Sequence, residues 1–289
     1  MKKDNHIVLA CVDQSSVATT VASYAAWAAH RLAAPLEFLH VIDRHSDIAV
    51  DQDLSGTIGL NAQVSLLNQL SDEDEVRSRQ RREAGRIFLN QLREQALAAG
   101  VASVDVRQRH GGIEETLSEQ QSEVRLFVLG RRGASAKNVQ RALGSNLEWV
   151  VRSVSRPTLV VSERYTEPSR VLLAFDGSGV TRRGVEMIAN SPLLKGLPIH
   201  IVMAGKAQAH SAKLVDSAQA VLTAAGFSVT TDVSTEAPEV VIPQAVKDQQ
   251  IDLLVMGSYS HSPLRAWLFG SKTTELLRSA KVSTLLLRR

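Results

Sequence analysis

The sequence contains an internal repeat, and this repeat constrains the fold more than any other feature does. Three pairs of matching residues are each separated by 126 positions, namely Gly144-Ser145 and Gly270-Ser271, Arg152-Ser153 and Arg278-Ser279, and Thr158 and Thr284. The match holds without a gap over this stretch. Self-similarity of this kind indicates that one structural unit is present twice along the chain.

Short apolar runs rich in branched residues alternate with amphipathic helical patterns in both halves. Such runs suit strands that are buried on both faces of a parallel sheet. We predict strands at residues 6–12, 36–42, 103–109, 125–129 and 158–162, and again at 170–175, 199–203, 228–233, 251–256 and 283–287. Strands that alternate with helices predict parallel sheets connected by right-handed crossovers and covered on both faces. The expected fold class is therefore α/β, with two tandem doubly wound domains of five parallel strands each.

The two predicted domains span residues 1–163 and 168–289, and a short polar segment with a proline joins them. The first domain is the longer one because it carries an inserted loop and a long helix at residues 43–100. Within this insertion we expect a loop over residues 43–69, with a short helix near its end as an alternative, followed by a helix that Ser71 caps and Gly100 ends.

The composition is that of an ordinary globular protein, and it limits the partners that we expect. The chain has 289 residues, of which 44% are hydrophobic and 22% charged, and its net charge is only +3. This small excess of bases gives no indication of nucleic acid binding. Cys11 is the only cysteine, so no intrachain disulfide can form and a reducing compartment fits. We read neither a signal peptide nor an apolar run of about 18 residues, so we expect a cytoplasmic protein without a membrane partner.

The stretch from Ile251 to Arg289 carries the clearest functional signal. Gly257 ends a predicted strand, and Gly270-Ser271-Lys272-Thr273 opens a helical pattern after a polar loop. Free backbone N–H groups at a helix start, with glycines nearby, can bind phosphate oxygens, and the helix dipole favours the negative charge. This stretch therefore predicts an anion site at the carboxyl end of a strand, where ligands bind in such sheets.

The spacing Gly257-x2-Ser260-x9-Gly270-Ser271 closely resembles the nucleotide loop of the universal stress protein family, which is Gly-x2-Gly-x9-Gly-Ser/Thr. Ser260 stands where that family has glycine, and a positive φ there would strain its backbone. The resemblance covers nearly the whole chain as two tandem copies. It implies a Rossmann-like nucleotide-binding fold, with ATP or the related AMP or ADP as ligand.

In this family the acidic residue after the first strand lies near the ribose and phosphate, a residue ending the second strand contacts adenine through its backbone, and the glycine loop holds the phosphates. For the second half the resemblance therefore implies a nucleotide site made of Asp176, Val202, Gly257, Ser258, Ser260, Gly270, Ser271, Lys272 and Thr273. A Mg²⁺ ion that bridges the phosphates and Asp176 is chemically reasonable.

The first half matches the same pattern less closely. Its loop reads Gly130-Arg131-Arg132-Gly133, then ten residues and Gly144-Ser145-Asn146, so its spacer is one residue longer. Gln14 also replaces the glycine that the second half has at Gly177. The resemblance implies a first-half site made of Asp13, Val41, Gly130, Arg131, Gly133, Gly144, Ser145 and Asn146. We expect the second half to bind nucleotide more tightly, because its loop needs less rearrangement.

The resemblance implies a stress-linked sensor or regulator, and two other functions stay open. A nucleotide-independent scaffold for protein partners is favoured by Ser260, Gln14 and the longer spacer of the first half. Slow ATP hydrolysis is the other alternative, with Asp13 or Asp176 positioning a metal-bound phosphate. Neither Gly-x4-Gly-Lys-Ser/Thr nor Gly-x-Ser-x-Gly occurs in the sequence, so no catalytic residue is nominated and the enzyme question stays open.

We also expect the two halves to pack as an internal pseudo-dimer through their last strands, at residues 158–162 and 283–287. Strand edges as apolar as these need to be covered by another chain segment. The sequence leaves open whether the full chain also forms a homodimer.

Overall fold

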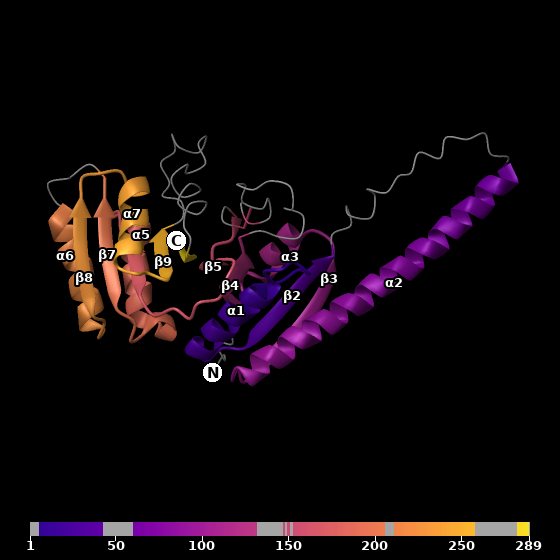
Figure 1. Ribbon diagram of the computed structural model, residues 1–289, viewed down its shortest axis with the longest axis horizontal. Helices are drawn as coiled ribbons and strands as arrows, with labels where there is room; N and C mark the ends of the chain where they lie inside the picture. The colour runs from indigo at the N-terminus through magenta and orange to yellow at the C-terminus, as the bar shows by residue number, and fades with distance from the viewer. Residues whose placement is uncertain are drawn as a thin grey trace.

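The computed structural model describes residues 6–42, 60–131, 147, 149–150, 153–205, 211–257 and 282–288, with only the backbone of residues 60–75, 77 and 78. The described strands form one sheet of ten strands in the order β3-β2-β1-β4-β5-β10-β9-β6-β7-β8. Figure 1 shows that the strands of each half stay together in this order. Each half thus contributes five strands, as the sequence predicts.

The strand boundaries follow the apolar runs closely. The first half contains β1 (Ile7–Cys11), β2 (Leu36–Ile42), β3 (Val104–His110), β4 (Val124–Gly130) and β5 (Thr158–Val161). The second half contains β6 (Val171–Ala174), β7 (Ile199–Ala204), β8 (Val229–Ser234), β9 (Leu253–Gly257) and β10 (Ser283–Leu287). Within each half all neighbouring strands are parallel.

The register of the strands shows that the repeat is structural. Val8 pairs with Leu36 and Leu126, and Val171 pairs in the same way with Ile199 and Leu253. At the last strand, Phe127 pairs with Thr158, whereas Leu254 pairs with Thr284. Phe127 of β4 and Leu254 of β9 are therefore equivalent, as are Thr158 of β5 and Thr284 of β10. The separation along the chain is one residue larger for the first pair than for the second. The extra first-half residue consequently lies between β4 and β5, where the longer spacer stands.

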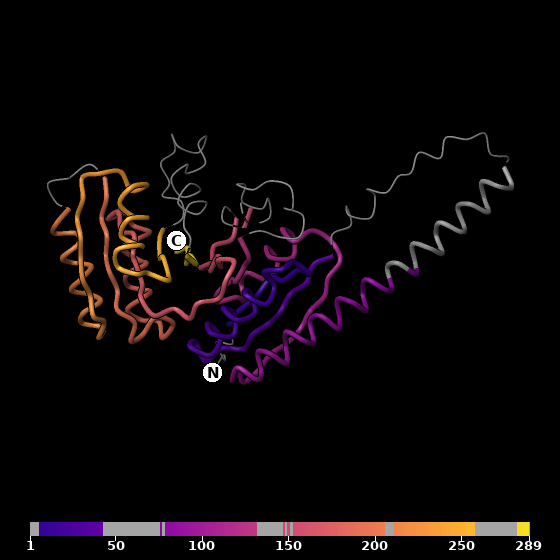
Figure 2. The backbone as a smooth tube through the Cα atoms, viewed as in Figure 1, coloured from indigo at the N-terminus to yellow at the C-terminus, as the bar shows by residue number. Residues whose placement is uncertain are grey.

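The two halves meet where β5 lies antiparallel to β10, and we call this strand pair the seam. Leu159 pairs with Leu285, and Val160 pairs with Thr284. Because the strands within each half are parallel while those at the seam are antiparallel, the carboxyl ends of the two halves lie at opposite edges of the sheet. Figure 2 shows the first and second halves of the chain as two lobes that meet at the middle of the molecule.

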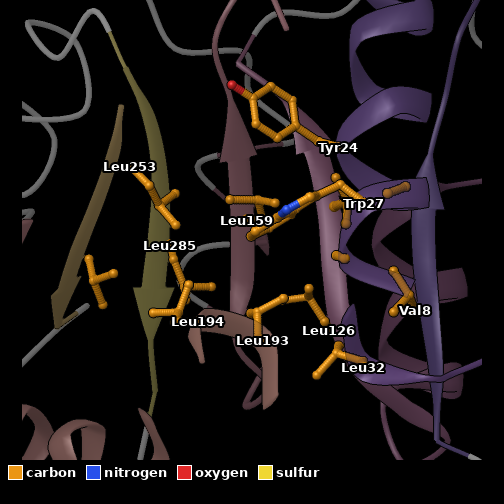
Figure 3. Packing of buried hydrophobic residues seen from close by; sticks show 14 of the residues in the cluster. Val8, Tyr24, Trp27, Leu32, Leu126, Leu159, Leu193, Leu194, Leu253 and Leu285 are labelled. Atoms are coloured by element: carbon orange, nitrogen blue, oxygen red, sulfur yellow. The ribbon is translucent and has the colours of Figure 1, made fainter. Parts of the chain in front are cut away.

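Helices cover both faces of the sheet. One buried cluster includes side chains of α1 (Ala18–Leu32), α2 (Leu60–Ala98), α5 (Gly179–Asn190) and α6 (Ser211–Ala224), and a second cluster includes those of α3 (Ile113–Gln120) and α7 (Pro238–Asp248). The first cluster continues across the seam, where Trp27 and Leu159 lie near Leu193 of the short 3-10 helix η3 (Pro192–Leu194) (Figure 3). The halves therefore share one apolar core in addition to the strand pairing.

One expectation about the connecting segments needs correction. The long helix α2 begins at Leu60, so Ser71 lies inside the helix and residues 60–69 are not a loop. The polar segment between the halves is hydrogen-bonded to α1. The Thr20 hydroxyl donates to the Glu163 carbonyl at 3.1 Å, and the Thr166 N–H donates to the Tyr24 hydroxyl at 3.3 Å. Among the described helices, none has the length and apolar character needed to cross a membrane.

Candidate functional site

The site in the second half begins with the turn after β6, which Asp176 organises. Oδ1 of Asp176 accepts a hydrogen bond of 2.9 Å from the Ser178 N–H and one of 2.7 Å from the Thr181 hydroxyl. Ser178 is the N-cap of α5, and its side chain accepts from the Thr181 N–H at 3.4 Å. The carboxylate of Asp176 is exposed at the start of this helix. Its Oδ1 atom therefore accepts two hydrogen bonds from the protein.

Gly177 is required by this turn. Its φ is +71°, a backbone conformation that residues with a side chain rarely adopt. A Cβ atom there would lie 2.8 Å from Cδ1 of Leu214. The first half makes the corresponding turn differently. Gln14 is not among the described non-glycine residues with positive φ, which are Ala33 and Gln250. The two turns thus share an aspartate and a serine, but the backbone of the residue between the aspartate and the serine differs, because Gly177 has a positive φ and Gln14 does not.

Gly257 lies beside the same turn, because β9 neighbours β6 in the sheet. A Cβ atom at Gly257 would lie 3.2 Å from Cγ2 of Thr181 and 3.3 Å from Cγ1 of Val180, both in the first turn of α5. The absence of a side chain at Gly257 therefore lets the end of β9 approach the start of α5. Asp176 and Gly257 come together here as the sequence predicts.

Thr181 is the residue that sequence reasoning missed. Its hydroxyl bonds to Asp176, and its methyl group faces Gly257, so one buried side chain contacts both predicted site residues. The signal was present as Asp176-x-Ser178-x-x-Thr181, in which a hydroxyl follows the N-cap by three residues. That spacing returns the side chain to the N-cap within one helical turn.

Val202 lies deeper in the sheet than expected. The strand β7 ends at Ala204, the side chain of Val202 is buried, and its carbonyl accepts from the Phe175 N–H at 2.9 Å. The first half has the same bond from the Val12 N–H to the Leu39 carbonyl, also at 2.9 Å. Val202 thus corresponds to Leu39, and Val41 corresponds to Ala204. The placement of Val202 at the end of its strand was therefore wrong by two residues.

The first half retains only part of the second-half arrangement. Oδ1 of Asp13 accepts a hydrogen bond of 3.1 Å from the Ser15 N–H, as Asp176 does from Ser178. Ala18 occupies the position that corresponds to Thr181, so the hydroxyl is missing. Arg131, which follows Gly130 at the end of β4, donates from Nη2 to the Val282 carbonyl of the second half at 3.0 Å. Its guanidinium group therefore contacts the other half of the chain.

Several predicted site residues lie outside the described part of the structure. These are Ser258, Ser260, Gly270, Ser271, Lys272 and Thr273 in the second half, and Gly133, Gly144, Ser145 and Asn146 in the first. Within the described ranges, no three His, Cys, Asp or Glu side chains gather in a way that could hold a metal ion.

The fold and the two turns define a class. This is a tandem doubly wound α/β protein, and ligands of such folds bind beyond the carboxyl ends of the strands. The model of the universal stress protein family matches residues 5–162 and again residues 168–288. The chain belongs to the universal stress protein family, with the family unit present twice.

Known proteins agree with this assignment over almost the whole length. A universal stress protein of Synechocystis sp. is 33% identical over 284 residues, which is 97% of this chain and 99% of the relative. A universal stress protein structure from Archaeoglobus fulgidus has a TM-score of 0.69 at 18% identity, covering 99% of this chain and 97% of its own. A functionally unknown protein from Pseudomonas aeruginosa has a TM-score of 0.63 at 17% identity, covering 98% of this chain and 92% of its own. These two structures share the fold.

Proposed function

We propose that this chain binds an adenine nucleotide, ATP or the related AMP or ADP, at the carboxyl edge of its second half and acts as a cytoplasmic stress-linked sensor or regulator. One observation carries the proposal. Asp176, in the turn after β6, and Gly257, at the end of the neighbouring strand β9, both contact Thr181 in the first turn of α5. An acidic turn beside a glycine strand end, with a helix start between them, suits the sugar and phosphates of a nucleotide.

The carboxylate of Asp176 is an acceptor that fits such a ligand. Among the described residues, both bonds to Asp176 go to Oδ1, so Oδ2 is the acceptor left for a ligand hydroxyl or a water of Mg²⁺. Gly257 has no side chain, so the end of β9 packs closely against Thr181 and Val180 in the first turn of α5. The phosphate donors of the proposal are the backbone N–H groups of the stretch that the sequence predicts as a loop and a helix start, which includes Gly270 and Ser271. Lys272 adds a positive charge in the same stretch.

For the first half we propose a weaker site, and one observation favours a structural role there instead. Arg131 is expected from the sequence to attract phosphate, but its guanidinium donates to the Val282 carbonyl across the seam. A residue engaged in this way contributes to joining the halves. The scaffold function consequently remains a second candidate for this half.

We further propose that residues 1–163 and 168–289 form two domains that pack as an internal pseudo-dimer. The antiparallel pairing of β5 with β10 and the shared apolar core support this arrangement. The mass of the full chain in solution, from size-exclusion chromatography with light scattering, distinguishes a single chain from a homodimer.

The proposed function is tested first on the purified full chain. Nucleotide released by acid from the folded protein is identified by chromatography and mass spectrometry. We expect an adenine nucleotide at up to one or two per chain. Protein pull-down with and without ATP tests the scaffold function, because a scaffold that does not need nucleotide captures the same partners in both. Absence of nucleotide together with ATP-independent capture would contradict the proposal.

A further inference from the structure

Thr181 joins the two parts of the second-half site through one side chain. It is the third residue of α5 and only 2% exposed. Its hydroxyl donates to Oδ1 of Asp176 at 2.7 Å, and its Cγ2 atom lies 3.2 Å from the place where Gly257 would carry a Cβ. The hydroxyl thus contacts the acidic turn, while the methyl group packs against the strand end.

The hydroxyl restricts the carboxylate of Asp176 before any ligand binds. A hydrogen bond to a charged group is stronger than one between neutral groups, and a buried β-branched donor has few rotamers. Asp176 is exposed, so without this bond its side chain would sample several rotamers in water. Ordering such a side chain on binding reduces affinity, and ordering it in advance removes that cost.

The first half provides a natural comparison. Asp13 also accepts a hydrogen bond from a serine N–H two residues later, but the residue that corresponds to Thr181 is Ala18. An alanine has no hydroxyl to donate. The two halves therefore share the turn and differ in whether a hydroxyl at this position of the helix donates to the aspartate.

We propose that Thr181 is a positioning residue that holds Asp176 and the end of β9 in the geometry for nucleotide, and that this contact makes the second half the tighter site. This inference rests on the proposed function. It assigns the difference between the halves to the described turn as well as to the loop spacer. Thr181 acts through Asp176 and Gly257 and need not touch the ligand.

Helix capping alone is the competing explanation for the same contacts. Ser178 caps α5 and accepts from the Thr181 N–H, so the threonine also belongs to the cap. A residue that only stabilises the helix start changes the stability of the free protein. A positioning residue changes nucleotide affinity, and it does so only while Asp176 is present. The two roles therefore separate in a double-mutant cycle.

The test uses the full chain and ATP titrations by calorimetry. Thr181→Val removes the hydroxyl and keeps the shape, Thr181→Ser keeps the hydroxyl, and Thr181→Ala reproduces the first half. We expect Thr181→Val and Thr181→Ala to weaken the tighter ATP site about tenfold, since a hydrogen bond to a charged partner is lost. Thr181→Ser should stay within about twofold of the parent. In an Asp176→Ala background, Thr181→Val should cause no further loss.

The two variants separate the two contacts of Thr181. An effect that passes through Asp176 appears in Thr181→Val and Thr181→Ala alike, whereas an effect on the strand end at Gly257 adds a further loss only in Thr181→Ala, which also removes the methyl group. Parent-like affinity of Thr181→Val and Thr181→Ala, or an equal loss with and without Asp176, would overturn the positioning role while leaving nucleotide binding intact. If the parent chain binds no nucleotide, the proposed function fails and this inference fails with it. Thermal unfolding of each variant confirms that it is folded.

Discussion

Arg131 of the first half donates a hydrogen bond of 3.0 Å to the backbone carbonyl of Val282 in the second half. A second arginine bond runs the other way, from Nε of Arg288 to the Val154 carbonyl at 2.6 Å. Val282 immediately precedes β10 and Arg288 follows it. The seam therefore has a guanidinium–carbonyl bond between the halves at each end of β10.

Substitution of Arg131 by methionine should destabilise the chain by about 1–2 kcal/mol. The variant keeps much of the apolar stem but leaves the Val282 carbonyl without this donor, and a hydrogen bond with a charged partner typically contributes this much. Urea unfolding measures the effect. Arg182→Met, at an exposed position of α5, is the matched control and should change stability by less than about 0.5 kcal/mol. Equal stability of the two variants would show that the Arg131 contact contributes little.

The two halves expressed separately should self-associate or aggregate. In the full chain β5 and β10 cover each other, and residues such as Leu159 and Leu285 are buried at the seam. Separation exposes two apolar strand edges, which pair with other chains. Light scattering of residues 1–163 and 168–289, with the full chain as reference, checks this. Two well-behaved monomers would contradict the proposed pseudo-dimer.

Glu37 should make stability depend on pH. Burial raises the pKa of this carboxyl group, Arg107 opposes the increase, and Asp105 adds to it. Because the folded pKa is raised, the ionised form is penalised in the folded state. This penalty is absent below the unfolded pKa of about 4.3 and appears as pH rises through the folded pKa. Glu37→Gln should therefore be more stable than the parent at pH 7.

This advantage should shrink as the pH falls and disappear well below the unfolded pKa, where Glu37 of the parent is protonated in both states. Urea unfolding over this pH range measures it. Glu119→Gln is the control, since its ion pair with Arg109 at 3.1 Å is solvent-exposed and should contribute little. A Glu37→Gln variant that is less stable than the parent at pH 7, by a margin that grows with pH, would show that the ion pair with Arg107 outweighs burial.

Cys11 should react with thiol reagents only when the chain unfolds. Burial raises the pKa of its thiol to about 12, with a further increase from the charge of Glu37, and the thiolate is the reactive form. At pH 8 the folded chain should resist a disulfide reagent, and denaturant should release one reactive thiol per chain. The labelling rate in the absence of denaturant should follow the opening of the first-half core. Rapid labelling of the folded chain would mean that β1 is more accessible than its burial indicates.

The strands were predictable because each is an apolar run bounded by polar or glycine residues. The bounds of β2 and β10 were predicted without error, and the repeat indicated the order of elements in both halves. The start of α2 was not predicted. Ser71 is a good N-cap residue in isolation, but serine inside a helix costs only a few tenths of a kcal/mol relative to alanine. A capping signal is therefore easily outweighed when apolar residues continue before it.

The backbone positions of Asp176 and Gly257 were predictable from the sequence, whereas the directions of the side chains around them were not. Strand ends placed Asp176 and Gly257 side by side, because parallel neighbours share an edge. The choice of acceptor by Thr181 and by Arg131 depends on rotamers that only the packed structure fixes. A phosphate-binding role and a seam contact have the same sequence signal at Arg131, a base after a strand.

Calorimetric titration of ATP into three proteins tests whether the second half is the principal nucleotide site. The parent is compared with Gly270→Val and Gly144→Val, in which a bulky side chain replaces the glycine expected beside the phosphates. We predict that Gly270→Val loses the tighter site and that Gly144→Val loses only the weaker one or none. If Gly144→Val removes most of the binding while Gly270→Val keeps the parent stoichiometry and affinity, the site has been assigned to the wrong half.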